Sequence, residues 1–134
     1  MRVLLAGTFD LLHPGHIRLL WRAKRKFGGE LIVIVARDEN VRRFKGREPI
    51  LEDRIRAFIL SSLKPVDRVV IGSEDIFRHI ERLKPDVIVL GYDQRIDEEY
   101  LSKALSMRGI EAKIVRAPRF GEYSSSSIRK KIRF

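Results

Sequence analysis

The chain opens on the stretch VLLAGTFDLLHPGH, residues 3–16, in which a short apolar run passes through a glycine into a His-Pro-Gly-His sequence. Residues 3–6 are aliphatic without interruption, a pattern typical of a strand buried on both faces of a parallel sheet. Pro14 suits the first position of a helix, because its missing N–H would be unpaired there anyway. The stretch therefore predicts a strand, a turn and the start of a helix, with His13 near the N-cap and His16 in the first helical turn.

The same alternation continues along the chain. Further short apolar runs at 31–36, 69–71, 87–90 and about 113–115 each predict a strand. Between them, apolar residues at helical spacing predict helices near 17–27, 55–64, 76–84 and 101–108, and a final short helix from about residue 125. In the second of these helices, the apolar residues are Ile55, Phe58 and Ile59. Alternating strands and helices predict a single α/β domain over residues 1–134, with a parallel sheet of about five strands and helices on both faces.

Composition narrows the classes of function. The chain has 134 residues, no cysteine, and 28 Lys and Arg against 18 Asp and Glu, a net charge of +10. The lack of cysteine excludes disulfides, thiolate metal sites and cysteine nucleophiles. No apolar run approaches the roughly 18 residues of a membrane-spanning helix, so we expect a cytoplasmic protein without a membrane partner. The positive charge favours anionic partners such as nucleotides and phosphorylated metabolites.

The His-Pro-Gly-His turn has the groups that a phosphate site needs. His13 and His16 flank Pro14 and Gly15 at the predicted amino end of a helix, where backbone N–H groups and a partial positive charge favour an anion. Gly15 has no side chain to hold a phosphate at a distance. Gly7 and Thr8 close the strand end, and Thr8 adds a hydroxyl. Neither G-x-x-x-x-G-K-[ST] nor G-x-G-x-x-G follows any strand, so this turn predicts phosphate chemistry of a different type from P-loop or dinucleotide-binding proteins.

Two other interpretations of the turn compete with this one. The two histidines could be purely structural. Alternatively, Asp10, His13 and His16 could bind a transition metal, but no further histidine or cysteine is near enough in sequence to complete the four ligands of structural zinc. We therefore predict phosphate binding and no dedicated protein metal site.

Three motifs carry a resemblance to a known family. GTFD at 7–10 with HPGH at 13–16 resembles the signature of the nucleotidyltransferase superfamily, which includes cytidylyltransferases and adenylyltransferases. The stretch YSSSSIR at 123–129 resembles its second element, and GYD at 91–93 resembles its nucleoside-binding turn. Over the whole chain the similarity is strongest to archaeal-type FAD synthases, in the stretches 33–38, 45–50, 63–67 and 84–91. The resemblance implies the Rossmann-like HxGH fold.

The resemblance also implies a reaction: transfer of AMP from ATP to the phosphate of FMN, with a divalent cation, most simply Mg²⁺, held mainly by the ATP phosphates. His13, His16, Lys45 and Arg119 would then be catalytic, with Lys45 on a basic loop after the second strand. The nucleotide would be bound by three groups of residues: Gly7, Thr8, Phe9, Pro14 and Gly15 at the first turn; Gly91 and Asp93; and Tyr123, Ser124, Ser125 and Ser126. The resemblance to the superfamily also implies a homodimer.

Two alternatives stay open at this point. The first is a CTP-dependent cytidylyltransferase acting on glycerol 3-phosphate, although the R-T-E-G-I-S stretch of that family stands here as RFGEYS at 119–124. The second is a basic module that binds nucleotide or nucleic acid without catalysis. Aromatic residues make up only 8% of the chain and do not alternate with basic ones, which disfavours nucleic acid as a partner.

Overall fold

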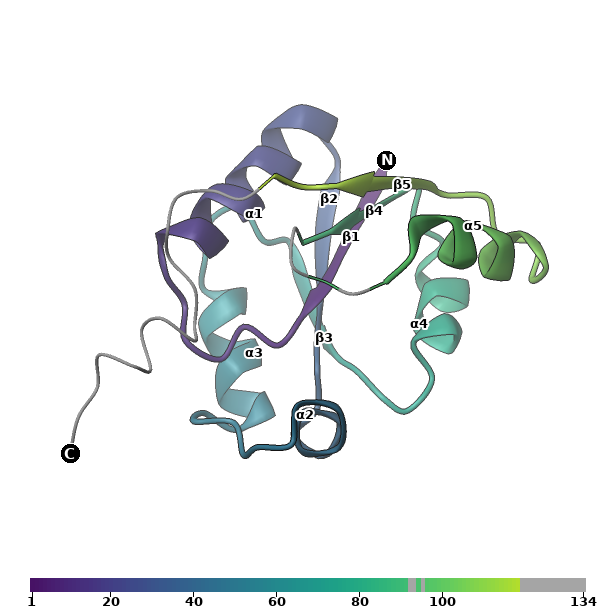
Figure 1. Cartoon of the computed structure of the whole chain (residues 1–134). Helices are drawn as coiled ribbons and strands as arrows, with labels where there is room; N and C mark the ends of the chain where they lie inside the picture. The colour runs from purple at the N-terminus through teal and green to yellow at the C-terminus, as the bar shows by residue number, and fades with distance from the viewer. Residues whose placement is uncertain (92–93, 95, 119–134) are drawn as a thin grey trace.

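The computed structural model describes residues 1–91, 94 and 96–118, and within this part of the chain five parallel strands form one sheet (Figure 1). Their spatial order is β3-β2-β1-β4-β5. The strands are β1 (Arg2–Gly7), β2 (Glu30–Val35), β3 (Arg68–Ile71), β4 (Val87–Leu90) and β5 (Lys113–Arg116). All five predicted strands are confirmed.

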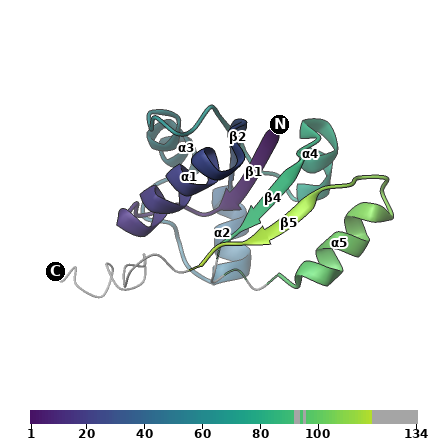
Figure 2. The same ribbon diagram turned by 90° about the horizontal axis from the view of Figure 1, so that it is seen from above.

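Five helices connect or follow the strands in the described part of the chain: α1 (Pro14–Phe27), α2 (Asp38–Lys45), α3 (Asp53–Ser61), α4 (Ile76–Leu83) and α5 (Glu98–Ser106). Figures 1 and 2 show α1 and α3 on one face of the sheet and α4 and α5 on the other. The predicted α/β class is therefore confirmed. None of these helices is long and apolar enough to cross a membrane.

Alternate residues of the central strands fill two cores. On one face, Val3 and Leu5 of β1 belong to the same buried cluster as Leu20 of α1 and Leu60 of α3. On the other face, Leu4 belongs to the cluster that contains residues of α4 and α5. Because both faces of β1, β2 and β4 are covered, these strands have the nearly continuous apolar sequence of a parallel sheet.

The strand order defines where a ligand site is expected. From β1 the chain proceeds to β2 and β3 on one side, and then returns to β4 and β5 on the other. The order reverses between β1 and β4, and open α/β sheets bind ligands outside the carboxyl ends of the strands at such a switch point. A ligand site is therefore expected at the segments that follow β1 and β4.

Two predictions about helices need correction. Lys45, expected on a loop, ends the helix α2, whose single buried residue Val41 gives too short an apolar pattern to be recognised. The second predicted helix exists as α3, but Ile55 and Phe58 are 42% and 69% exposed, and Arg56 is buried in their place. An arginine can occupy an interior position when its donors are satisfied, as they are here.

Asp67, just before β3, makes the stability of the folded state depend on pH. Its carboxylate accepts hydrogen bonds from Lys24 Nζ and from the N–H of Leu31. Partial burial alone would raise the Asp67 pKa, but these two hydrogen bonds and the Lys24 charge outweigh it, so the pKa lies below the ordinary aspartate value. The ionised form therefore stabilises the folded state above the unfolded-state pKa, and this contribution is lost as the pH falls through the folded-state pKa.

We expect Asp67→Asn to lower the melting temperature by about 1–4 °C at pH 7 and the gap to wild type to shrink below about pH 4. Thermal unfolding followed by circular dichroism between pH 2.5 and 7 measures this gap. Glu111→Gln, which changes an exposed carboxylate, is the matched control. A gap that stays constant over the whole pH range would contradict the assignment.

Candidate active site

The turn after β1 is shaped by Phe9. Phe9 has a positive φ of 52°, and its ring is buried at 6% exposure in the core beneath α1. A Cβ at Gly7 would lie 2.9 Å from Phe9 Cε2, so glycine is required there to let the ring pass. The Phe9 side chain therefore faces the core, and any contact of this residue with a ligand falls to its backbone.

The start of α1 matches the prediction. His13 is the N-cap, Pro14 is the first helical residue and His16 lies in the first turn. The two histidines cap the helix reciprocally: the N–H of Gly15 donates to His13 Nδ1 at 3.1 Å, and the N–H of His13 donates to His16 Nδ1 at 3.3 Å. Each ring is thereby held by its Nδ1 atom.

These two hydrogen bonds assign the tautomers. A nitrogen that accepts a hydrogen bond carries no proton, so in a neutral imidazole the proton is on the other nitrogen. Both His13 and His16 are therefore Nε2–H donors. The rings lie against each other, with centroids 3.8 Å apart and planes 33° apart. Two imidazolium cations at this separation would repel, which disfavours the state in which both rings are protonated.

One expectation about this helix end is wrong. The sequence predicts open backbone amides for a phosphate, but the Gly15 N–H is bound to the His13 ring and the His16 N–H donates to the His13 carbonyl at 3.0 Å. The side chain of the N-cap residue takes over a role that the ligand was expected to have. The donors at this helix end are thus imidazole N–H groups.

Asp10 has a structural role. Its carboxylate, at 2% exposure, accepts hydrogen bonds from the N–H groups of Ile50 and Leu51 at 2.8 and 2.9 Å, and Arg47 lies 3.6 Å away. It therefore ties the segment after α2 to the turn before His13. No group of three potential metal ligands gathers among the residues that the structure describes.

Arg56 of α3 also holds the turn after β1 in place. The side chain is 1% exposed and donates to the carbonyls of Thr8 at 2.7 Å and Leu51 at 2.9 Å, and to Asp38 Oδ1 at 2.8 Å. One guanidinium therefore joins the turn after β1, the loop before α3 and the start of α2. Nothing in the local sequence distinguishes Arg56 from its exposed neighbour Arg54, so sequence analysis missed it.

Lys45 is the last residue of α2 and not part of a loop as predicted. Gly46 follows with φ of 65° and ends the helix in the left-handed conformation that glycine adopts without strain. The chain then reaches Ile50, which Asp10 binds. Lys45 therefore lies five residues before Ile50, which is fixed to the β1–α1 turn.

The other side of the switch point is organised by two residues that the sequence analysis did not identify, Gln94 and Arg116. Gly91 directly follows β4, and its N–H donates to Gln94 Oε1 at 2.8 Å while its carbonyl accepts from Arg116 Nη1 at 2.9 Å. Gln94 is the single glutamine of the chain, which is the only sequence signal that could have drawn attention to it.

The remaining predicted site residues lie outside the described part of the chain. These are Asp93, Arg119, Tyr123, Ser124, Ser125 and Ser126. The described residues thus bring together Gly7, Thr8, Phe9 and the histidine pair at the end of β1, with Gly91 at the end of the adjacent β4.

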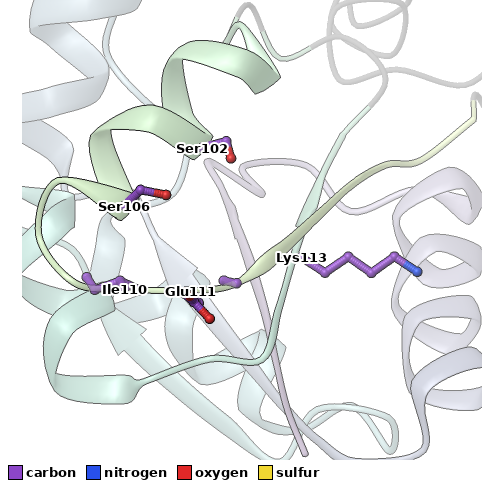
Figure 3. A pocket seen from close by; sticks show the side chains of 6 residues that line it. Ser102, Ser106, Ile110, Glu111 and Lys113 are labelled. Carbon is purple, nitrogen blue, oxygen red and sulfur yellow. The ribbon is translucent and has the colours of Figure 1, made fainter.

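A separate pocket lies between α5 and β5 (Figure 3). It is lined by Ser102, Ser106, Ile110, Glu111, Ala112 and Lys113. Lys113 opens β5, so the pocket is at the amino ends of the strands, opposite the switch point. Figure 3 also shows the Lys113 side chain extending away from the two serines, so the polar groups do not converge on a ligand.

Comparisons with known proteins show the family of this chain. The family model described as cytidylyltransferase-like matches residues 4–131, and the chain belongs to this family. It is 58% identical to the FAD synthase of Korarchaeum cryptofilum, over 98% of this chain and 90% of that protein. It is 47% identical to the FAD synthase of Aciduliprofundum boonei, over 97% and 87% of the two chains.

A solved structure has the same fold. It is described as a lipopolysaccharide core biosynthesis protein from Thermoplasma volcanium, is 43% identical, and superposes with a TM-score of 0.86 over 90% of this chain and 98% of that chain.

Proposed function

We propose that this protein is an FAD synthase: it transfers AMP from ATP to the phosphate of FMN and releases pyrophosphate. The observation that carries the proposal is the close pair of imidazole rings, held by their Nδ1 atoms at the amino end of α1, beside the switch point of the sheet. The identity to curated FAD synthases over nearly the whole chain supports FMN as the acceptor. The net charge of +10 suits two phosphorylated substrates.

The reaction is a direct in-line displacement. An oxygen of the FMN phosphate attacks the α-phosphorus of ATP, a new P–O–P bond forms, and the bond to the oxygen bridging the α- and β-phosphorus breaks, so that the electron pair leaves with pyrophosphate. The attacking phosphate is already largely ionised near neutral pH, because its second pKa is about 6. No strong general base is needed, and catalysis rests on positioning and charge stabilisation.

His13 and His16 supply hydrogen-bond donors to the triphosphate. Donation from neutral imidazoles lets both rings remain close together while charge builds up on the phosphate oxygens. Their positions are fixed by the cap hydrogen bonds, so they need no reorganisation during the reaction. Phe9, whose ring centroid is 5.4 Å from that of His16, supports His16 from the core side.

Other parts of the proposal rest on the family resemblance. Lys45 and Arg119 would neutralise the leaving pyrophosphate, and Ser124, Ser125 and Ser126 would bind the β- and γ-phosphates. Thr8, Pro14, Gly15, Gly91, Asp93 and Tyr123 would line the nucleotide. ATP would enter as its magnesium complex, with the ion on the phosphate oxygens, since the carboxylate nearest the histidine turn, Asp10, is occupied by backbone amides. The active form would be a homodimer.

The test is a product analysis with crossed substrates. Purified protein is incubated with Mg²⁺, with either ATP or CTP, and with either FMN or glycerol 3-phosphate, and the products are separated by chromatography. FAD formed from ATP and FMN alone is the expected result. A CDP-glycerol peak without FAD would instead support the cytidylyltransferase alternative, and binding without any product would support the non-catalytic one.

A further inference from the structure

Two side chains contact the described residues between β4 and α5: Gln94, which lies within this stretch, and Arg116 of β5. Of this segment, residues 91–97, the structure describes Gly91, Gln94, Ile96 and Asp97. Between these residues one backbone hydrogen bond is made, from Gln94 N to the Gly91 carbonyl at 3.2 Å. Further hydrogen bonds to Gly91, Gln94 and Ile96 come from the side chains of Gln94 and Arg116.

The Gln94 carboxamide joins β1 to the segment. Its Oε1 atom accepts from the N–H of Gly91 at 2.8 Å, and its Nε2 atom donates to the carbonyl of Ala6 at 2.8 Å. The pairing between β1 and β4 ends at Leu5 and Val89, just before these two residues. The carboxamide thus serves as a peptide group would, bridging the two central strands where they stop pairing at the switch point.

The Arg116 guanidinium binds the segment from the end of β5. Nη1 donates to the carbonyls of Gly91 at 2.9 Å and Gln94 at 2.6 Å, Nη2 donates to the carbonyl of Ile96 at 2.6 Å, and Nε donates to Glu98 Oε1 at 2.9 Å. Four of its five N–H donors are used in a planar arrangement. A lysine at this position has one ammonium group on a flexible stem and cannot reproduce this geometry.

We propose that Gln94 and Arg116 are positioning residues for the nucleoside half of the ATP site. They fix the backbone of Gly91, which the proposed function places at the nucleotide, so this inference rests on that function. Neither residue need touch ATP. The histidine pair binds the phosphates from the other side of the switch point and does not share these contacts, so the two halves of the site should respond separately to substitution.

The separation leads to a specific expectation. Arg116→Gln and Arg116→Lys should each weaken ATP binding at least tenfold, the effect of losing hydrogen bonds that involve a charged donor. Inorganic pyrophosphate has no nucleoside, so its affinity should change less than twofold. Lysine keeps the positive charge but not the hydrogen-bond geometry of arginine. Equal losses of ATP affinity in both variants would therefore show that Arg116 acts by positioning the backbone and not by attracting the phosphates. Gln94→Met should weaken ATP binding about fivefold or more.

The experiment is calorimetric titration of the full chain with ATP and, separately, with pyrophosphate, both with Mg²⁺, together with KM and kcat for FAD formation. The control is Arg108→Gln, because Arg108 lies in the α5–β5 connection before the amino end of β5, where it pairs with Glu81 at 3.5 Å and packs on Phe77. We expect the Arg116 variants to raise the KM for ATP with kcat and the KM for FMN within about threefold of wild type.

Loss of ATP and pyrophosphate affinity in equal measure, or unchanged ATP affinity with a lower melting temperature, would overturn the inference, since both are signs of a merely structural role. Rescue by Arg116→Lys would overturn the geometric argument as well. Binding is measured without chemistry, so a wild-type protein that makes no FAD, yet loses only ATP affinity on substitution, would support the inference while refuting the proposed function.

Discussion

His16→Ala is expected to lower the kcat of FAD formation about 10²- to 10³-fold, the effect of removing one donor that stabilises the transition state. The Nε2–H of His16 is lost, and His13 loses both the ring that packs against it and the acceptor for its backbone N–H. The loss of this cap hydrogen bond should cost only about 1 kcal/mol, so the protein should still fold. Steady-state kinetics at saturating ATP and FMN, with circular dichroism to verify folding, measure the effect.

His79→Ala is the matched control for this prediction. His79 is the third histidine of the chain, lies on α4 and contacts Ser73 Oγ at 3.0 Å, away from the turn after β1. Its variant should retain kcat within about twofold, because no donor to the phosphates is lost. A His16→Ala enzyme with near-normal kcat would contradict the role assigned to the histidine pair.

Arg56→Met is expected to lower the free energy of unfolding by about 3–5 kcal/mol, the range for breaking one partner out of a buried ion pair. Methionine fills similar space but leaves the Asp38 carboxylate without its cation and the carbonyls of Thr8 and Leu51 without their donor. Because Thr8 precedes the histidine turn, we also expect a lower kcat in the folded fraction. Urea denaturation followed by tryptophan fluorescence, using the single tryptophan, measures the stability.

Arg54→Met is the natural comparison, since Arg54 is on the same helix but exposed. A surface substitution of this kind should change stability by no more than about 0.5 kcal/mol. Equal stabilities of the two variants would show that Arg56 does not hold the turn in the way its contacts indicate.

The strands and α1 could be predicted because their signals are local. Continuous apolar runs identify strands buried on both faces, and Pro14 identifies the first position of a helix wherever the rest of the chain lies. The His-Pro-Gly-His turn follows β1 and begins α1, as these local signals predicted. The resemblance of the GTFD and HPGH motifs then supplied the class of reaction, which the residues alone limited only to phosphate chemistry.

The contacts that hold the site could not be predicted because they join residues far apart in sequence. Arg56 reaches a carbonyl 48 residues away, and Gln94 reaches one 88 residues away. Their acceptors are backbone carbonyls, which every residue has, so sequence carries no mark of the pairing. The orientation of the His13 ring could not be predicted for a related reason. A residue at the N-cap can leave the helix N–H groups to a ligand or bind them with its own side chain, and the sequence does not distinguish the two.

The most direct test of the account is the protonation of the two imidazoles. Long-range ¹H–¹⁵N correlation spectra at pH 7, in which His13→Ala and His16→Ala assign the signals, distinguish Nε2–H from Nδ1–H rings. We expect both rings as neutral Nε2–H tautomers whose Nε2 resonances shift when a nonhydrolysable ATP analogue and Mg²⁺ are added. Nδ1–H tautomers, or Nε2 resonances that do not respond to the analogue, would contradict a histidine pair that donates to the triphosphate.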